Sequence, residues 1–535
     1  MSAAQNEALY IGDLFAMGAS EHPNSRMTLD HRLALFPESG TSVTYRRLAD
    51  HVEEVSARLA AAEIRAGEQV FLFASNTFDL VLTACALSRL GAVPLLLSPK
   101  LDGDVVAQLL TKTDEPAVLL TDPATLRGAL DGVDVTAATS RVLLLTGEAD
   151  GHESLDRHAG APRRAAVRTE PDAPCLATHT SGTTGLPKLV LQSARSLWWH
   201  LKPQLRTAKI MRAREARAIC VSLVHARIWP LLYIVISRGQ HTVVLTDPDP
   251  RKAADLLSET RPGLLEAHPN ILIQWEALAD DPRGPLANVR YFINTFDAMH
   301  PRTIRILLGA SRRRMPVYVQ GYGQSETGPV CLRPYTRRLA RTADGRCLGF
   351  PFKGVTEVRI GEPLADASGP EKVGPLLVRT HGHSVGIIGG AEQFAQRFAG
   401  GWWRMGDLGY RSRWGCVHLL DREIDHIDGV TSSLQVEDVL MERLPELTEV
   451  VLVEGKDGNP VPVVATHGDR PLGTAAWQRA VAGLPGMAEP LHSPWHALPM
   501  TSTWKVRRQL LGAMVADGSL PLVGSPDQGR AERLT

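Results

Sequence analysis

The segment "YRRLADHVEEVSARLAAA" (Tyr45–Ala62), followed shortly by "QVFLFA" (Gln69–Ala74), decides the fold class. In the first part, apolar residues recur at the spacing that places them on one face of a helix, namely Leu48, Val52, Val55 and Leu59. The second part is a short apolar run, which is typical of a buried strand. A helix followed by a buried strand predicts one unit of an α/β fold.

The same alternation returns twice along the chain. Residues 78–98 read "FDLVLTACALSRLGA" and then "VPLLLS", and residues 250–267 read "PRKAADLLSETRP" and then "GLLEA". Polar residues or glycines separate these elements. Repeated helix and strand units predict an α/β class with largely parallel sheets.

The length of 535 residues exceeds what one hydrophobic core supports and predicts more than one domain. After Arg422 the chain changes to the short elements "EVVLVEG", "VPVVATH" and "TAAWQRAVAGL", which indicate a small α+β unit. We therefore expect an N-terminal domain over residues 1–421, a hinge at 422–425 and a C-terminal unit over 426–518. Residues 519–535 lack periodicity and are expected to form a frayed tail.

The composition favours a cytoplasmic protein that acts on small molecules. Lys and Arg number 58 and Asp and Glu also number 58, so the overall charge attracts neither nucleic acid nor an anionic membrane. The six cysteines contain no C-x-x-C pair, which argues against a disulfide framework or a zinc site. The first residues do not form a signal peptide, and no run of about 18 apolar residues occurs.

The stretch "THTSGTTGLPKLV" (Thr178–Val190) places small and hydroxylated residues in front of Lys188. Such a loop can turn several backbone N–H groups and hydroxyls toward a polyphosphate. Its spacing is not that of a P-loop, because Pro187 follows the last glycine closely and cannot donate an N–H. By itself, a Ser, Thr and Gly cluster is more often a solvated turn.

Four motifs together give this loop a specific meaning. "TSGTTGLPK" resembles the phosphate loop of the adenylate-forming superfamily, which includes acyl- and aryl-CoA synthetases, luciferases and the adenylation domains of peptide synthetases. Further motifs of that family are similar to "QGYGQSETG" (Gln320–Gly328), "GWWRMGDLGY" (Gly401–Tyr410) and "LPMTSTWKVRR" (Leu498–Arg508). They follow in family order, and the resemblance extends over roughly residues 40–510.

The resemblance implies a large N-terminal domain of stacked α/β subdomains and a small mobile C-terminal lid. It also implies a reaction in two halves. A carboxylate attacks the α-phosphorus of ATP to give an acyl-adenylate and pyrophosphate, and a nucleophile then displaces AMP. The implied cofactors are ATP and Mg²⁺.

The family motifs assign roles around the phosphates. The loop residues that would close over the β- and γ-phosphates are Thr180, Ser181, Gly182, Thr183, Thr184 and Gly185, with Lys188 as a charge partner. Gly321 and Tyr322 would lie against the nucleotide, with the tyrosine ring on the adenine. Ser325 would offer its hydroxyl to the α-phosphate. Glu326 would hold Mg²⁺, a hard cation that favours carboxylate oxygen.

Three further residues complete the implied nucleotide site. Asp407 would accept hydrogen bonds from both ribose hydroxyls. Arg422 would contact the nucleotide, although Asp421 stands before it where the family has glycine. Lys505 would stabilise the charge that develops at the α-phosphate in the transition state. The implied catalytic residues are Lys505, Ser325 and Glu326.

The acyl pocket departs from the family pattern. The family's glycine-rich loop is replaced by "NTFDAMHP", which puts Phe296 and Asp297 where small residues are common. Arg227 and Trp229 are unusual and could place a cation and a ring beside the substrate. The expected substrate-pocket residues are His225, Arg227, Trp229, Phe296, Asp297, Ala298 and Gln324. These residues disfavour a long fatty chain and favour a small or aromatic acid.

The acceptor is expected to be an amine, giving an amide. Ile424 replaces the acidic or lysine hinge of relatives that rotate the lid for coenzyme A, and the loop that follows it is short. His225 or Asp297 could accept the amine proton. Three alternatives remain: a coenzyme A ligase, an enzyme that activates a small oxyacid such as nitrite for diazotisation, and a scaffold that binds nucleotide without catalysis.

We predict that adenylation depends on Lys505. Replacing it in Lys505→Ala removes a preorganised charge, so the adenylation rate should fall by about 10² or more while ATP binding persists. Pyrophosphate–ATP isotope exchange measures the first half-reaction directly. Exchange at the wild-type rate in this variant would show that the assignment is wrong.

Overall fold

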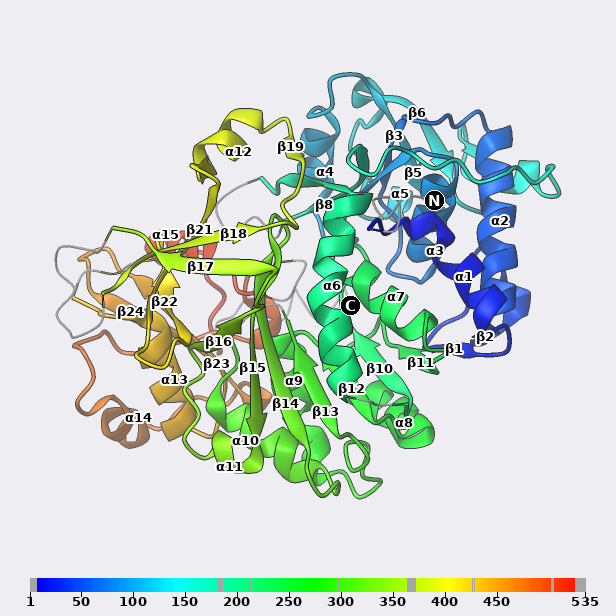
Figure 1. The fold of residues 1–535 in the computed structure, drawn as a ribbon. Coiled ribbons are helices and arrows are strands. Elements are labelled where there is room, and N and C mark those ends of the chain that lie inside the picture. The colour runs from blue at the N-terminus through cyan, green and yellow to red at the C-terminus, as the bar shows by residue number, and fades with distance from the viewer. Residues whose placement is uncertain are drawn as a thin grey trace.

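The computed structural model describes residues 7–180, 186–211, 214–295, 298–362, 372–425, 427, 429–501 and 505–524. Within these residues the chain has a mixed α/β fold with a large, sheet-rich N-terminal part (Figure 1). The fold class predicted from the sequence is therefore confirmed. No helix among the described residues has both the length and the apolar character needed to cross a lipid bilayer.

The larger sheet has 14 strands among the described residues. In spatial order they are β17 (Thr356–Ile360), β18 (Gly374–Thr380), β21 (Trp402–Arg411), β22 (Val417–Arg422), β16 (Cys347–Pro351), β15 (Gly328–Thr336), β14 (Val317–Gln324), β13 (Tyr291–Asn294), β12 (Leu264–Ala267), β10 (Arg217–Cys220), β11 (Thr242–Val244), β1 (Arg26–Leu29) and β2 (Ser42–Thr44), with β20 (Phe398–Ala399) beside β21. Neighbouring strands from β1 to β14 are parallel, as predicted. From β14 to β17 neighbouring strands are antiparallel.

The second sheet has eight strands among the described residues. In spatial order they are β19 (Gly386–Ile388), β9 (Leu189–Ser193), β8 (Pro174–His179), β4 (Val93–Leu96), β3 (Gln69–Leu72), β5 (Ala117–Thr121), β6 (Thr139–Leu144) and β7 (Glu153–Ser154). The strands from β8 to β7 run parallel, whereas β9 and β19 are antiparallel additions at one edge.

Helices cover and separate the two sheets. They are α1 (Leu14–Glu21), α2 (Tyr45–Ala61), α3 (Asp79–Arg89), α4 (Gly103–Leu110), α5 (Pro123–Arg127), α6 (Ala194–Met211), α7 (Ile228–Ile236), α8 (Pro250–Thr260), α9 (Pro269–Gln274), α10 (Pro301–Ala310), α11 (Arg337–Ala340) and α12 (Ala391–Arg397). The quoted helix and strand of the opening segment are α2 and β3. Figure 1 shows α6 and α7 between the two sheets. One hydrophobic cluster joins Leu72 and Leu96 of the second sheet to Leu197 of α6 and Trp229 of α7.

The chain after Arg422 builds a unit of its own. It contains the sheet β23 (Leu447–Glu454), β24 (Pro460–Thr466) and β25 (Leu491–His492), and the helices α13 (Ser433–Arg443), α14 (Thr474–Val481) and α15 (Arg508–Asp517). Two hydrophobic clusters draw only on residues from Ile427 onward. The domain limits 1–421, 422–425 and 426–518 remain our interpretation of this arrangement.

The segment predicted to be frayed begins with packed residues. Leu520 is buried among the side chains of the C-terminal sheet, and the carbonyl of Pro521 accepts a hydrogen bond from Ser493. The expectation of a frayed tail is therefore wrong for residues 519–524, because they carry an apolar anchor. Residues 525–535 lie outside the described part of the chain.

Buried charges of the N-terminal part hold both ends of α13. At the N-terminal end, the carboxylate of Asp421 accepts hydrogen bonds from the backbone N–H groups of Ser433 and Leu434. At the C-terminal end, the guanidinium of Arg302 donates to the carbonyls of Met441, Leu444 and Leu447. The arginine, and the aspartate when ionised, have the sign that the helix dipole favours at each end. Burial raises the pKa of Asp421 to about 7.

A second contact joins the residue that caps α10 to α13, and it involves a histidine whose pKa is shifted. The side chains of His300 and Asp438 lie 2.6 Å apart. Burial lowers the pKa of His300, but the hydrogen bond that its ring donates to Asp438 and the charges of Asp438, Glu449 and Glu437 outweigh burial and raise it to about 9. Burial also raises the pKa of Glu449, to about 7.

We predict that this pair loses its stabilising effect in mildly alkaline solution. A histidine with a raised folded-state pKa contributes stability that is fully present below its unfolded pKa, about 6.5, and is lost as the pH rises through about 9. Between about pH 7 and pH 9.5, the Tm of the wild type should therefore fall by a few degrees more than that of Asp438→Asn.

Thermal unfolding followed by circular dichroism measures this difference. The matched control is Asp457→Asn, which changes an exposed aspartate of the same unit. That variant should follow the wild type. Identical pH dependence in the wild type and Asp438→Asn would contradict the assigned role of the pair.

Candidate active site

A cavity of about 330 Å³ lies between α6, α7 and the carboxyl ends of β13 and β14. A smaller cavity of about 170 Å³ adjoins it on the side of the C-terminal unit. Both are lined by Arg422, Lys505 and the segment 321–324. The predicted motifs therefore meet in one place although they are far apart in the sequence.

The second motif forms the hairpin between β14 and β15, and its glycines are required by close packing. A Cβ on Gly323 would lie 2.2 Å from the carbonyl oxygen of Gly328. Gly328 has a φ of +68°, and a Cβ there would collide with the ring of His200. The hairpin thus brings Ser325 and Glu326 against α6 at the edge of the cavity.

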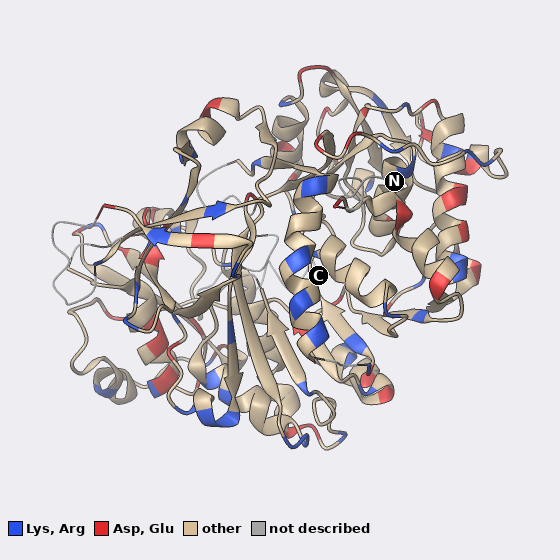
Figure 2. Ribbon diagram, viewed as in Figure 1, with Lys and Arg blue, Asp and Glu red and all other residues tan. Residues whose placement is uncertain are grey.

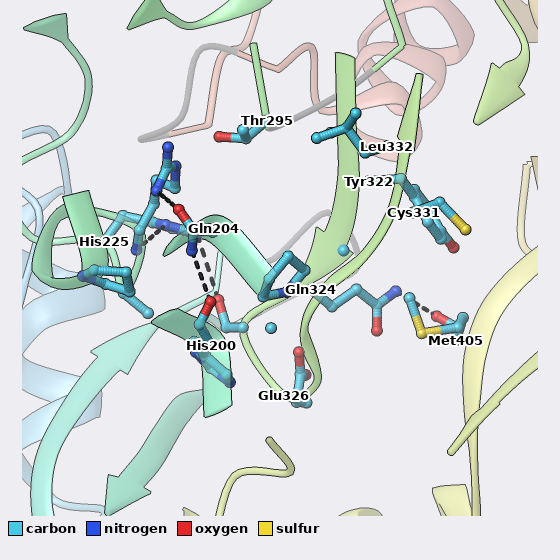
Figure 3. Close-up of a pocket in the computed structure, with 18 of the residues that line it drawn as sticks. His200, Gln204, His225, Thr295, Tyr322, Gln324, Glu326, Cys331, Leu332 and Met405 are labelled. Carbon is cyan, nitrogen blue, oxygen red and sulfur yellow. Dashed lines mark hydrogen bonds between the residues drawn. The ribbon is translucent and has the colours of Figure 1, made fainter. Parts of the chain in front are cut away.

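Gln324 connects this hairpin to β21. Its side-chain nitrogen donates to the carbonyl of Met405 at 2.6 Å, and its side-chain oxygen accepts from the indole of Trp403 at 3.3 Å. Gln324 lines both cavities, as expected for a pocket residue, but its amide already has partners on both sides. Its position is therefore fixed by β21 (Figure 3).

Glu326 lies in the cavity wall beside basic groups. Burial raises the pKa of this carboxyl, while the positive charges of Arg397 and Lys188 act in the opposite direction. No three His, Cys, Asp or Glu side chains gather into a metal site within the described ranges. One buried carboxylate suits Mg²⁺, which can take its other ligands from phosphates and water.

The residues predicted to hold the nucleoside form one cluster. The hydroxyl of Tyr322 donates to one carboxylate oxygen of Asp407, and Nε of Arg422 lies 3.8 Å from the other. Asp407 and Arg422 face each other across the β21–β22 pair. Burial and the neighbouring Asp407 raise the pKa of Tyr322, which keeps its hydroxyl protonated.

Lys505 reaches this cluster from the C-terminal unit. Its backbone N–H donates to the hydroxyl of Thr501 at 3.0 Å, and its carbonyl accepts from the N–H of Thr501 at 2.7 Å. These two hydrogen bonds hold the backbone of Lys505, which lies in the wall of both cavities.

His225 is a neutral hydrogen-bond donor at the edge of the site. Burial, followed by the charges of His179, Lys505 and Arg227, lowers its pKa to about 3. Its Nδ1 accepts the backbone N–H of Arg227 at 3.1 Å, which leaves the hydrogen on Nε2, 3.4 Å from the hydroxyl of Ser325. Ser325 can then donate its own hydrogen into the cavity. This geometry argues against His225 as the proton acceptor.

Thr180 and Lys188, on either side of the expected phosphate loop, also line the larger cavity. The N–H of Thr180 donates to the carbonyl of Lys188 at 2.8 Å, and the N–H of Lys188 donates to the hydroxyl of Thr180 at 3.2 Å. The other expected loop and floor residues lie outside the described residues: Ser181, Gly182, Thr183, Thr184, Gly185, Phe296 and Asp297. Ala298 lines the smaller cavity together with Gly321.

Of the remaining two expected pocket residues, Arg227 lines the larger cavity and Trp229 does not. Arg227 lines the larger cavity, where its guanidinium is paired with Glu266 at 2.6 Å and donates to Gln204. Trp229 does not line either cavity. It is fully buried in the core between the sheets, because it belongs to the first turn of α7, which packs there.

Sequence reasoning missed several cavity residues. Arg217, His200 and Gln204 line the larger cavity, and Glu266 pairs with Arg227 beside it. A usable signal existed for two of them, because Arg217 and Glu266 are charged residues within otherwise apolar strand segments. Such residues are rarely buried without a partner or a function.

Comparisons of the sequence and of the structure with known proteins both find adenylate-forming enzymes. Residues 16–387 match the model of the AMP-binding enzyme family. The chain is 44% identical over 547 residues to 3-amino-2-hydroxy-4-methoxybenzoate diazotase of Streptomyces cremeus, covering 98% of each chain. It is 25% identical over 448 residues to 4-chlorobenzoate–CoA ligase of an Arthrobacter species, covering 82% of each. Among solved structures, an anthranilate CoA ligase in complex with anthranoyl-AMP superposes with a TM-score of 0.80 at 18% identity, covering 97% of this chain and 100% of the other.

We predict that Asp407 determines nucleotide affinity. In Asp407→Asn the charge is lost while the shape is kept, so hydrogen bonds to the ribose should weaken and the KM for ATP should rise roughly tenfold or more. The control Tyr322→Phe keeps Asp407 charged and should change KM less. Steady-state kinetics at varied ATP measures both, and an unchanged KM in Asp407→Asn would refute the role.

Proposed function

Because the chain belongs to the AMP-binding enzyme family, and is an AMP-forming ligase of the adenylate-forming class, we propose that the acid it activates is nitrite. We further propose that the nucleophile is an aromatic amine, which leaves the enzyme as a diazonium compound. The supporting observation is the 44% identity, over 98% of both chains, to an enzyme named for diazotising an aminobenzoate.

The proposed reaction balances without an outside oxidant or reductant. A nitrite oxygen attacks the α-phosphorus of ATP, the bond to the bridging oxygen breaks, and pyrophosphate leaves. The amine nitrogen then attacks the nitroso nitrogen of the mixed anhydride, AMP leaves with the electron pair of the broken N–O bond, and the amine nitrogen releases one proton to solvent. The N-nitrosamine formed passes its N–H proton to oxygen and, after a further protonation, loses water to give the diazonium ion.

The residues around the cavity have the chemistry for the first step. Lys505 and the hydroxyl of Ser325 would stabilise the negative charge that develops on the α-phosphate oxygens, because both line the same cavity. Glu326 would hold Mg²⁺, which supplies further charge neutralisation when bound. Lys188 and Arg397 line the cavity beside Glu326 and would face the β- and γ-phosphates.

The reactions expected from the sequence remain as alternatives. An aromatic acid could itself be activated and transferred to an amine or to coenzyme A, and the similarity to 4-chlorobenzoate–CoA ligase favours the second of these. These reactions consume a carboxylate, whereas diazotisation consumes nitrite and an amino group. Product analysis can therefore separate them.

We predict AMP release that requires both nitrite and an aromatic amine. The wild type is incubated near neutral pH with ATP, Mg²⁺, ¹⁵N-nitrite and a panel of aminobenzoates. AMP is quantified, and the diazonium product is trapped with a naphthol as an azo dye. Mass spectrometry should find one ¹⁵N atom in the dye.

Reactions without ATP, and reactions with coenzyme A or a simple amine in place of nitrite, serve as controls. Background diazotisation is slow near neutral pH and is measured without enzyme. A thioester or amide product with no nitrite-dependent AMP would reject diazotisation and restore the corresponding alternative.

A further inference from the structure

The larger cavity extends well beyond the space that nitrite needs. Its wall follows one face of α6 through His200, Gln204, Thr207, Ala208 and Met211. The rise of an α-helix gives roughly 16 Å between the first and the last of these positions. Figure 3 shows His200, Gln204 and His225 across the cavity from Tyr322 and Met405. The cavity can therefore hold an aromatic molecule beside the nucleotide.

The inner end of this cavity contains a buried cluster of two arginines and one glutamate. One carboxylate oxygen of Glu266 accepts from Nε of Arg227 at 2.8 Å and from a terminal nitrogen of the same guanidinium at 2.6 Å. Glu266 is fully buried, and Arg217 is only 5% exposed. Arg217 and Arg227 both line the cavity.

Arg217 is not neutralised by a partner of its own. Among the described residues, none forms a hydrogen bond with its guanidinium, and its Nε is buried without a partner. Glu266 is already paired with Arg227, so the cluster keeps one positive charge in excess. Burial and the charge of Arg227 lower the pKa of Arg217, whereas the charge of Glu266 raises it, and the result is about 10. The side chain therefore stays charged near neutral pH.

An unpaired buried cation is costly unless a ligand supplies the missing negative charge. A carboxylate fits best, since a planar guanidinium binds it through two parallel hydrogen bonds. The nucleotide phosphates are expected at the other end of the cavity, beside Lys188 and Ser325. The inner cluster is thus available to a second anionic group.

We propose that Arg217, with Arg227, binds the carboxylate of the aromatic amine. This inference rests on the proposed function and specifies its substrate class as aromatic amines that carry a carboxylate away from the reacting amino group. The carboxylate is held at the inner end of the cavity, so the amino group is the end that faces the activated nitrite. The substrate's carboxylate is then recognised and is not adenylated.

The first test is equilibrium binding without ATP or nitrite. Titration calorimetry compares 3-aminobenzoate with the neutral isostere 3-aminobenzamide. The wild type should prefer the carboxylate, and Arg217→Met should reduce its affinity roughly tenfold to a hundredfold, as expected for a charged hydrogen bond. The affinity for 3-aminobenzamide should differ by less than about threefold between the wild type and Arg217→Met. Equal wild-type affinity for the two compounds would overturn the inference.

The variants are chosen to leave the fold intact. Arg217→Met preserves the pair between Arg227 and Glu266, whereas changing Arg227 would leave Glu266 buried without its partner. The matched control is Arg206→Met on the exposed face of α6, where basic positions recur (Figure 2). It should bind like the wild type. Arg217→Lys keeps the charge and should recover part of the affinity, and Tm values verify folding.

Nitrite-dependent turnover separates this inference from the proposed function. If binding depends on Arg217 but no nitrite-dependent AMP forms, the carboxylate site stands and diazotisation fails. If diazotisation occurs but Arg217→Met changes kcat/KM equally for the carboxylate and the amide, the function stands and the carboxylate site fails. The inference requires that Arg217→Met lower kcat/KM more for 3-aminobenzoate than for 3-aminobenzamide.

Discussion

The position of the C-terminal unit depends on buried charges at the two ends of α13. Asp421 accepts from N–H groups at its first turn, and Arg302 donates to carbonyl groups in and just after its last turn. Without α13, Asp421 would lose two backbone donors and Arg302 would lose its carbonyl acceptors and keep the carboxylate of Glu276, 3.4 Å away. Buried charged groups that lose partners in this way are unfavourable. The same unit carries Lys505, which lines the larger cavity together with residues of the N-terminal part. The site is therefore complete only while α13 is docked.

Within the site, the distribution of charge separates two regions. Around Tyr322, Asp407 and Arg422, the carboxylate accepts a hydrogen bond from the tyrosine and lies 3.8 Å from Nε of the arginine, so the charges of this region are paired. Around Arg217, positive charge is in excess, and an anionic ligand would neutralise it. Between them, the neutral His225 donates toward Ser325 and so directs the serine hydrogen outward. Preorganised donors of this kind stabilise developing charge without reorganisation during the reaction.

The sequence predicted the elements and the motifs well, because both are local properties. Hydrophobic periodicity was sufficient to predict α2 and β3. The resemblance of four motifs to those of one family implied a common site for Glu326, Asp407 and Lys505. Glu326 and Lys505 line the larger cavity, and Asp407 and Lys505 line the adjoining smaller one. The sequence could not predict that β14 and the later strands pair antiparallel, since register depends on distant partners. Trp229 looked like a pocket residue because its neighbours are, yet the direction of each side chain on α7 sends it into the core.

The burial of Arg217 also has a consequence for the surroundings in which the site can work. At moderate ionic strength, mobile ions screen the attraction between solvent-exposed charges that lie more than about 10 Å apart, but they screen buried charges much less. Salt therefore weakens the attraction of an anion to the exposed basic residues of α6 more than its attraction to the buried Arg217. Recognition of an anion by Arg217 should thus depend only weakly on the ionic strength of the medium.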